Sequence, residues 1–398
     1  MNKKISISLL YLLILAGTAH AALRVTDLRT EQLKNPLGID IRHPRLGWRI
    51  ESDEQNVMQT AYHILVASSP ELLAQGKGDC WDSGKVKTDA SQWITYQGET
   101  LKRNTPYYWK VKVYTHTNET DWSEPASWSM GLLNEADWQG QWIGLDRPAP
   151  GDSETQWSRL AARYLRKEFA LTKEVKRATV HIAGMGLYEL FINGQRIGEQ
   201  VLAPAPTDYR KTILYNTYDV TPQLQKENAI GVILGNGRFY TMRQNYKPYK
   251  IPTFGYPKLR LNLIVEYTDG SRQTIASDIS WKLTTEGPIR SNNEYDGEEY
   301  DARKELGDWN RTGYDDTNWI PAGRVSIPSG TLRAQMMPGM KVTESLKPVS
   351  IRKQGDKHIL DIGQNMAGWL RIRIKGQAGD SILSLIHISE PTRRVVIS

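Results

Sequence analysis

Short segments that alternate apolar and polar residues, separated by turn residues, run through the whole chain, with almost no helical periodicity. Such segments predict strands. The predicted strands are Ala61–Ala67, Tyr107–Thr115, Ala178–Ala183, Tyr188–Asn193, Ala229–Leu234, Leu259–Tyr267 and Leu370–Lys375. Many short strands at this spacing favour β-sandwiches or barrels over a parallel α/β sheet. The sequence therefore predicts an all-β fold of tandem β-sandwiches.

Turn chemistry supports the same architecture. The dipeptides Asn193-Gly194, Asn236-Gly237 and Asp269-Gly270 are typical of two-residue hairpin loops. One short helix is expected at Pro70–Gln75, and Arg163–Phe169 is expected to be an edge strand because charged residues interrupt it.

The N-terminal segment, residues 1–22, has the features of a secretory signal peptide. Lys3 and Lys4 precede the mainly apolar run Ile5–Ala16, and Ala19-His20-Ala21 supplies a small-x-small cleavage pattern. A membrane anchor is the alternative, but the run is shorter than the ~20 residues that a spanning helix needs. We expect a bacterial protein that is secreted or periplasmic, with no membrane association after cleavage.

Cysteine content and charge narrow the function classes. Cys80 is the only cysteine, which excludes an intramolecular disulfide and a cysteine-based zinc site. The formal net charge of +7 includes the two signal lysines and a basic C-terminal tail. The remaining excess gives no reason to expect a nucleic-acid partner.

The C-terminal segment, residues 383–398, differs from the rest of the chain. The eleven residues Leu383–Arg393 match the translation of a transposase adapter used in sequencing libraries. We therefore expect a sequencing artefact there. The alternative is a genuine strand, because Ser384–Ser389 alternates weakly.

The chain divides into modules by composition. Residues 23–133 contain a strand with Tyr107, Trp109, Val111 and Val113 on one face, followed by a polar turn and a Trp-Ser segment. This arrangement resembles the end of a fibronectin type III-like domain, in which the tryptophans fill a small core.

Three further segments follow. Residues 134–159 form a connector with Trp138, Trp142 and Trp157, which we expect to pack against its neighbours. Residues 160–333 form a second module, and a third begins at residues 338–382.

Five motifs occur in the order typical of one enzyme family. They are Gly186–Gly194 with its Asn-Gly turn, Asp208-Tyr209-Arg210, Tyr218-Asp219-Val220-Thr221, Tyr295–Arg303, and Gly363–Trp369. Over Leu23–Ile382 the chain resembles the N-terminal half of a bacterial α-L-rhamnosidase of glycoside hydrolase family 78.

The resemblance implies a fibronectin-like domain, a jelly roll and the start of a concanavalin-like sandwich. It places hydrolysis, with inversion at the sugar, in a following (α/α)6 barrel, to which nothing here corresponds. No catalytic residue is therefore carried over. The chain is expected to be an inactive N-terminal fragment of an enzyme acting on rhamnose-containing oligosaccharides or polysaccharides. A stand-alone carbohydrate-binding or adhesin-like protein is the alternative.

An acidic segment supplies the first group of candidate site residues. Asp296, Glu298, Tyr300 and Asp301 lie close together, and in a strand the first three share one face. Carboxylates beside a tyrosine suit sugar hydroxyls, the rim of an active site, or Ca²⁺, which takes six to eight oxygen ligands. No cofactor is required. The alternative is a structural turn whose acids pair with nearby cations, namely Arg290, Arg303 or Lys304.

A glycine-flanked loop supplies the second group. Asn236, Arg238 and Tyr240, with Phe239, follow an apolar strand, and such loops often present sugar-binding groups. A hairpin with an exposed aromatic is the alternative. Gly235-x-Gly237 lacks the third glycine of a dinucleotide fingerprint, and the chain has no His-Glu-x-x-His or Gly-x-Ser-x-Gly motif.

Overall fold

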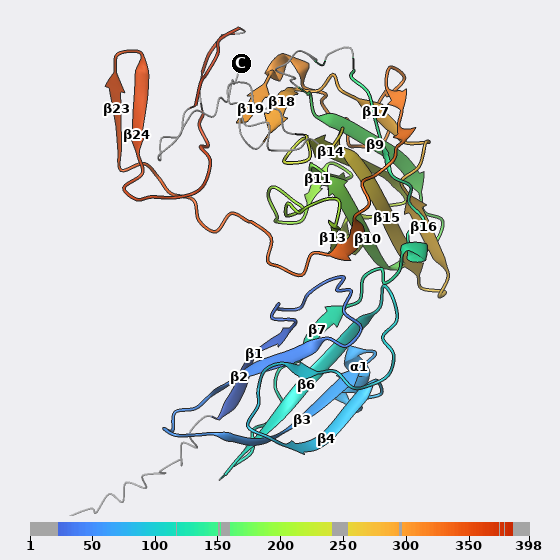
Figure 1. Ribbon diagram of the computed structural model, residues 1–398, viewed down its shortest axis with the longest axis vertical. Helices are drawn as coiled ribbons and strands as arrows, with labels where there is room; N and C mark the ends of the chain where they lie inside the picture. Colours follow the sequence, from blue (N-terminus) through green and yellow to red (C-terminus); the bar gives the residue numbers. More distant parts are fainter. Residues whose placement is uncertain are drawn as a thin grey trace, which may run out of the picture. The chain divides into compact units, whose positions relative to one another are not determined.

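The computed structural model describes residues 23–116, 118–149, 152, 160–240, 254–293, 297–373, 375–377 and 379–384. Its regular structure is almost entirely β-strand, which confirms the predicted fold class (Figure 1). Among these residues no helix is long and apolar enough to cross a membrane. Two compact units result. The first holds most of residues 23–127, and the second holds the remainder together with residues 36–42 and 100–106.

The first unit is a sandwich of two antiparallel sheets. A three-stranded sheet has the order β1 (Arg24–Thr30), β2 (Arg45–Glu51) and β5 (Ile94–Thr95). A four-stranded sheet has the order β4 (Trp81–Lys87), β3 (Gln59–Ala67), β6 (Pro106–Thr115) and β7 (Ala126–Ser129). As predicted from the alternation, Tyr107, Trp109, Val111 and Val113 of β6 are buried.

The one α-helix in the described part of the chain begins where the sequence predicts it. α1 (Pro70–Ala74) follows Ser69, whose side chain accepts a hydrogen bond from the Leu72 N–H. A serine cap and a proline in the first turn are typical of helix starts. Leu73 points into the core beside β3.

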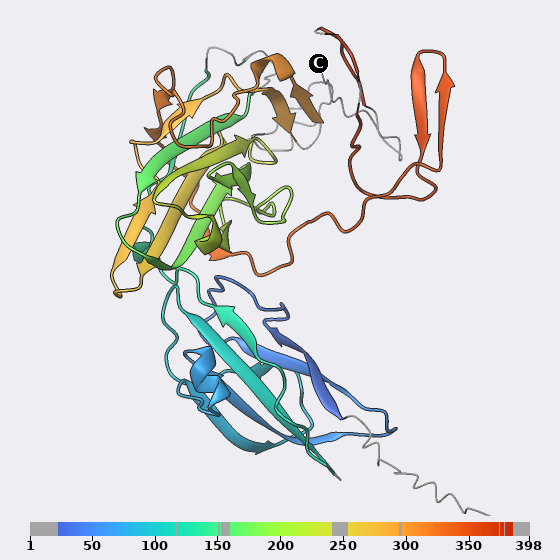
Figure 2. The ribbon, with the colours of Figure 1, turned by 180° about the vertical axis from the view of Figure 1, so that it is seen from behind.

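The second unit is a larger sandwich (Figures 1 and 2). One sheet has the order β21 (Gly323–Arg324), β8 (Ile143–Gly144), β15 (Lys258–Tyr267), β10 (Val175–Met185), β13 (Thr212–Asp219) and β22 (Thr331–Ala334), with β16 (Arg272–Ala276) also paired to β15. The other has the order β12 (Gln195–Ile197), β11 (Leu187–Ile192), β14 (Glu227–Gly235), β9 (Arg163–Ala170), β17 (Lys282–Thr284) and β20 (Ile320–Pro321). Apolar residues from both sheets form one core between them.

Two of the predicted hairpins are present and one is not. Asn193 and Gly194 both have positive φ, 51° and 82°, as a type I′ turn between β11 and β12 requires. Gly270 likewise turns the chain from β15 to β16. The hairpin predicted at Asn236-Gly237 is wrong, because β15, the next strand of the described residues, belongs to the opposite sheet.

Two strand predictions also need correction. β9 is not an edge strand, since it pairs with β14 on one side and β17 on the other. Its arginines are buried with carboxylate partners: Arg163 pairs with Asp152 and Arg166 with Asp316. Paired charges are tolerated in an interior that would exclude lone ones. In Leu370–Lys375, the described residues 370–373 form no strand.

The Trp-rich connector packs into the second unit. Trp138 and Trp142 are buried, and the Trp138 ring meets Tyr215 edge to face at 5.3 Å between centroids. β8 of the same segment pairs with β15. Trp157 lies outside the described residues.

A buried histidine lies at the centre of this packing. His181 of β10 has Nδ1 2.9 Å from Thr217 Oγ1 and Nε2 3.1 Å from Asn104 Oδ1. Burial, with a smaller contribution from Arg177, lowers the pKa of His181 to about 3. The ring is therefore neutral throughout the physiological pH range.

A mostly irregular segment, residues 302–319, packs on the outer face of the six-stranded sheet, and we call it the cover. It starts with the short 3-10 helix η3 (Ala302–Lys304). Trp309 packs edge to face on Tyr164 and stacks on Trp319. Arg166 fastens the cover, because its Nε donates to the Trp309 carbonyl at 2.9 Å and its Nη2 to the Arg311 carbonyl at 3.0 Å.

Two further hairpins form separate two-stranded sheets. β18 (Ile289–Asn293) pairs with β19 (Gly297–Tyr300), and β23 (Ser350–Gln354) pairs with β24 (Lys357–Asp361). The first of these carries the acidic candidates.

Candidate functional site

The acidic segment forms one strand of the β18–β19 hairpin. Glu298 lies opposite Asn292 and Glu299 opposite Ser291. Asp296, with Glu294 and Tyr295, lies outside the described residues, so its predicted role stays a prediction. Gly297 has a φ of 77°, a backbone conformation that favours glycine, at the start of β19.

The hairpin meets the glycine-flanked loop through two asparagines. Asn292 Oδ1 accepts from the Asn236 N–H at 2.7 Å, and Asn236 Nδ2 donates to the Asn292 carbonyl at 2.7 Å and the Leu160 carbonyl at 2.9 Å. A Cβ atom on Gly235 would lie 2.9 Å from Asn292 Oδ1, so glycine permits this approach. The two candidate groups, which were predicted separately from the sequence, are therefore neighbours that the Asn236–Asn292 hydrogen bonds join.

Each of these asparagines has one buried polar atom that finds no hydrogen-bond partner among the described residues, namely Asn236 Oδ1 and Asn292 Nδ2. Asn236 itself is only 2% exposed. A buried acceptor and a buried donor without a partner each suit a water molecule or a hydroxyl group.

Glu298 sits beside a second carboxylate. Burial, and secondarily the charge of Glu189 on β11, raise the pKa of the Glu298 carboxyl. Glu189 is itself paired with Arg196, whose Nε lies 3.3 Å from Glu189 Oε1. Burial also raises the pKa of the neighbouring Tyr164 hydroxyl, with Glu298 and Glu189 among the smaller causes. Among the described acidic candidates, Glu298 is the one whose carboxyl group the fold shifts towards its neutral, protonated form.

Tyr300 and Asp301 make contacts within their own turn. The Tyr300 hydroxyl donates to the Glu305 carboxylate. Asp301 caps η3 and forms a 2.8 Å ion pair with Arg303, which lowers the pKa of Asp301 to about 2. This geometry matches the alternative of a structural turn with paired charges for Asp301.

The other cations near the turn also have structural partners. Lys304 pairs with Glu286 at 2.8 Å, and Arg290 Nη1 donates to the carbonyls of Thr285 and Gly287. Among the described residues no three acidic, histidine or cysteine side chains converge as a metal ion requires.

The aromatic residues of the glycine-flanked loop point inward. Phe239 is fully buried, and Tyr240 is 7% exposed and stacks on Tyr256 at 5.7 Å. Arg238 is half-buried. The alternative of a hairpin with an exposed aromatic is wrong, because Phe239 and Tyr240 are both buried and Phe239 stacks on Phe254.

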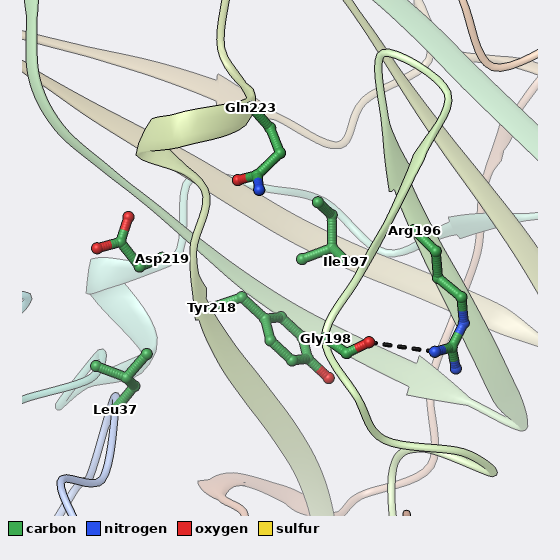
Figure 3. A pocket seen from close by; sticks show the side chains of 7 residues that line it. All are labelled: Leu37, Arg196, Ile197, Gly198, Tyr218, Asp219 and Gln223. Atoms are coloured by element: carbon green, nitrogen blue, oxygen red, sulfur yellow. Dashed lines mark hydrogen bonds between the residues drawn. The ribbon is translucent and has the colours of Figure 1, made fainter. Parts of the chain in front are cut away.

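A cavity of about 220 Å³ lies beside β12 and β13 (Figure 3). It is lined by Leu37, Arg196, Ile197, Gly198, Tyr218, Asp219 and Gln223. Its polar groups are largely engaged elsewhere. Arg196 donates to the carbonyls of Gly198 and Gln200, and Asp219 Oδ1 accepts from the Thr221 N–H and hydroxyl. The Tyr-Asp-Val-Thr motif thus shapes a turn, with Val220 in the core.

The first unit contains a larger cavity of about 350 Å³ that the sequence did not indicate. It has Trp81 and Trp93 in its lining. The available signal was weak: Trp93 directly follows the short, mainly polar run Asp89–Gln92, outside any strand predicted from the sequence.

Three family models match the chain. Residues 25–134 match a Rha78A-like N-terminal immunoglobulin domain, residues 173–344 the α-L-rhamnosidase N-terminal domain, and residues 351–390 the bacterial α-L-rhamnosidase concanavalin-like domain. The last match extends into the segment for which an adapter was expected, and that expectation stays a prediction.

Individual relatives agree with these matches. The chain is 40% identical over 369 residues to an α-L-rhamnosidase of Formosa agariphila, covering 87% of this chain and 39% of that protein. The α-L-rhamnosidase structure from Dictyoglumus thermophilum is 39% identical, with a TM-score of 0.75 over 86% of this chain and 39% of that one. The Streptomyces avermitilis α-L-rhamnosidase complexed with L-rhamnose is 25% identical, with a TM-score of 0.83 over 93% of this chain and 52% of that one.

The chain spans about two fifths of the length of the Formosa and Dictyoglumus proteins, whose N-terminal portion it matches. Two β-sandwich units, the paired Asn-Gly hairpin and the acidic hairpin all fall within the matched residues. The chain therefore carries the N-terminal domains of the α-L-rhamnosidase family.

Proposed function

We propose that the chain is the non-catalytic N-terminal part of an exported α-L-rhamnosidase that acts on rhamnose-containing glycans. The observation that carries the proposal is the 40% identity to the Formosa α-L-rhamnosidase over 369 residues. The Streptomyces relative was solved with L-rhamnose, which supports rhamnose as the sugar. The N-terminal segment supports export by its sequence alone, because residues 1–22 lie outside the described part of the chain.

The assignment of hydrolysis to another part of the protein has chemical support. Glycoside hydrolysis by the usual route needs two carboxylates across the scissile bond, one acting as an acid and the other as a base or nucleophile. Glu298 and Glu189 are the neighbouring carboxylates of the candidate site. However, Glu189 forms an ion pair with Arg196. Glu298 lies on the β18–β19 hairpin, which is joined to the glycine-flanked loop by the hydrogen bond from the Asn236 N–H to the Asn292 side chain.

In this proposal the acidic hairpin and the glycine-flanked loop present polar groups to the glycan or to the rest of the enzyme. Glu298 is the residue of interest, since its raised pKa keeps it closer to a hydrogen-bond donor than an exposed glutamate. Among the other described candidates, Asn236 is connected to Glu298 through Asn292, the residue opposite Glu298 in the hairpin.

Two assays test the proposal. The chain as given should release no p-nitrophenol from p-nitrophenyl α-L-rhamnoside, whereas the product of the complete reading frame should hydrolyse it with inversion, followed by NMR of the released sugar. Hydrolysis by the chain alone would contradict its non-catalytic role. A stop codon directly after Ile382 in the genomic DNA, or a complete product inactive on rhamnosides, would favour the carbohydrate-binding alternative.

Two further measurements test the finer points. N-terminal sequencing of the exported protein should begin near Leu23. Calorimetric titration of the chain with L-rhamnose, with and without Ca²⁺, should show whether the candidate site binds the free sugar and whether the ion contributes.

A further inference from the structure

A groove opens between the edges of the two sheets in the first unit, and we call it the β4–β5 groove. β4 is the outer strand of the four-stranded sheet and β5 the outer strand of the three-stranded sheet. The groove has a volume of about 350 Å³ and is lined by Tyr62, Trp81, Asp82, Ser83, Val86, Trp93, Ile94, Thr95 and Gln97. Small-molecule sites are typically about 300–1,000 Å³ and combine apolar walls with a few polar groups.

Trp93 is the most unusual residue of this lining. Its side chain is large and apolar, yet the residue is 53% exposed, and its φ of 61° lies in the left-handed region. A bulky residue avoids that region unless the surrounding structure imposes it, and such strained residues cluster at functional sites. Because its backbone is strained and its side chain is exposed, Trp93 is not placed to stabilise the folded state.

A fixed cation holds the Trp93 ring in place. The Arg45 guanidinium carbon lies 4.4 Å from the indole centroid. Arg45 is itself anchored by the buried Glu31 carboxylate, at 2.5 Å from Nη2 to Oε2. A guanidinium over one face of an indole is an attractive contact and leaves the ring oriented before any ligand arrives.

Polar groups on the groove are ready to bind hydroxyls. Asp82 Oδ1 is held by His63 Nε2 at 2.6 Å and by the Gly84 N–H at 2.9 Å. The Asp82 side chain remains 55% exposed, and its Oδ2 has no partner among the described residues. Gln97 and Thr95 are also exposed, and the described residues give their side chains no hydrogen-bond partner. The Gly84 N–H lowers the pKa of Asp82, so the carboxylate is an acceptor at neutral pH.

We propose that the β4–β5 groove is a non-catalytic saccharide-binding site, in which a sugar ring stacks on Trp93 and Trp81 while its hydroxyls bind Asp82, Gln97 and Thr95. A flat aromatic face against the C–H face of a pyranose, rimmed by polar side chains, is the chemistry that recognises neutral sugars. That the saccharide contains rhamnose rests on the proposed function; that the groove binds a saccharide does not.

A peptide added to the edge strands fits this groove less well. β5 is only two residues long. The pairing of β3 with β4 shifts register between His63 and Leu65, which places a bulge at Ser83 and Gly84. Short strands and bulges interrupt the row of backbone groups that an added strand needs. The same bulge turns the Asp82 and Ser83 side chains relative to a regular strand.

The test uses the full chain labelled with ¹⁵N, with the indole N–H signals of Trp81 and Trp93 assigned from Trp81→Phe and Trp93→Phe. Rhamnogalacturonan I oligosaccharides are titrated in, with cellohexaose and an extended valine-rich peptide as comparison probes. We expect both indole signals to shift with the rhamnose-containing probe. Trp93→Gly should weaken binding at least tenfold, whereas Trp369→Ala, which removes a tryptophan of similar exposure, should bind as the unchanged protein does.

Thermal melting separates a binding role from a structural one. Trp93→Gly relieves the left-handed backbone strain, so its Tm should equal or exceed that of the unchanged protein. Strong destabilisation with retained binding would overturn the proposal, as would indole signals that respond to the peptide or to no probe. A response to cellohexaose alone would support the saccharide site and remove rhamnose as its ligand, without bearing on the rhamnosidase assay.

Discussion

Arg166 offers the sharpest test of how the second unit is held together. Its side chain is 2% exposed and donates to four acceptors. Three belong to the cover, namely the carbonyls of Trp309 and Arg311 and the carboxylate of Asp316, and the fourth is the Glu168 carboxylate on β9 itself. Arg166→Met keeps an unbranched apolar stem, lacks the guanidinium group, and removes every one of these hydrogen bonds. We expect the cover to loosen and the unit to lose stability.

The magnitude follows from the exposure of the partners. Hydrogen bonds from a charged donor contribute about 1.5–3 kcal/mol each. The carboxylates of Asp316 and Glu168 are 25% and 40% exposed, so water replaces much of what they lose. The loss is dominated by the two backbone carbonyls and is offset because methionine needs no desolvation of a charge. We therefore expect a net destabilisation of about 3 kcal/mol, or a Tm lower by about 6–12 °C for a unit of this size.

Calorimetry and limited proteolysis measure the effect. The transition of the second unit should shift, and trypsin should cleave earlier at Arg303 and Lys304 in the cover. Arg166→Lys keeps the positive charge but lacks the planar guanidinium group, so its Tm should lie between those of Arg166→Met and the unchanged protein. Arg24→Met, which removes an exposed ion pair with Glu51, should leave the Tm unchanged. An Arg166→Met protein that melts within 1 °C of the unchanged one would refute the reasoning.

Three further predictions follow from buried or crowded groups. A Cβ at Gly231 would lie 2.8 Å from the Trp309 ring, so Gly231→Ala should cost about 1–3 kcal/mol and expose the cover to protease; an unaltered Tm would contradict this. The pKa of His181 is lowered to about 3 from an ordinary 6.5. Between these two pH values the unfolded state binds more protons than the folded state, so the free energy of unfolding falls as the pH drops, by about 1.4 kcal/mol per pH unit. His181→Gln should remove this pH dependence of the free energy of unfolding, measured by urea titration at pH 7, 5.5 and 4.5. The exposed His358→Gln is the control, and a pH dependence identical to that of the unchanged protein would count against a neutral buried His181 ring. The pKa of Glu298 is raised by burial and by Glu189, so its ionisation costs stability at pH 7 and costs nothing below the ordinary glutamate pKa. Glu298→Gln should therefore raise the Tm at pH 7 and leave it unchanged near pH 3.5, and a lower Tm at pH 7 would show that the carboxylate is needed in its ionised form.

The sequence was sufficient to predict those elements whose conformation depends on interactions between neighbouring residues. The period-2 alternation of Tyr107–Val113 gave β6 and its buried face, because alternate side chains of a strand point to opposite sides. Ser69 and Pro70 gave the start of α1, and Asn193-Gly194 gave the β11–β12 turn, because each acts through its own backbone.

Interactions across the sequence account for the errors and omissions. β9 was expected at an edge because its charges are visible in the sequence, while their carboxylate partners, such as Asp316, lie up to 150 residues away. The burial of Tyr240 depends on Tyr256 and on the core beneath it. No local signal could show that Asn236 would bind Asn292, or that Trp93 would face a groove made by strands of two different sheets.

The sequence by itself determined an all-β chain of tandem sandwiches, the place of most strands and the family resemblance carried by an ordered set of motifs. Only the tertiary structure decided which strands are neighbours, which charges are paired in the interior and which aromatic residues stay exposed. The physical reason is that strand formation depends on the alternation of neighbouring residues, whereas burial and pairing depend on side chains that the fold brings together from distant parts of the chain.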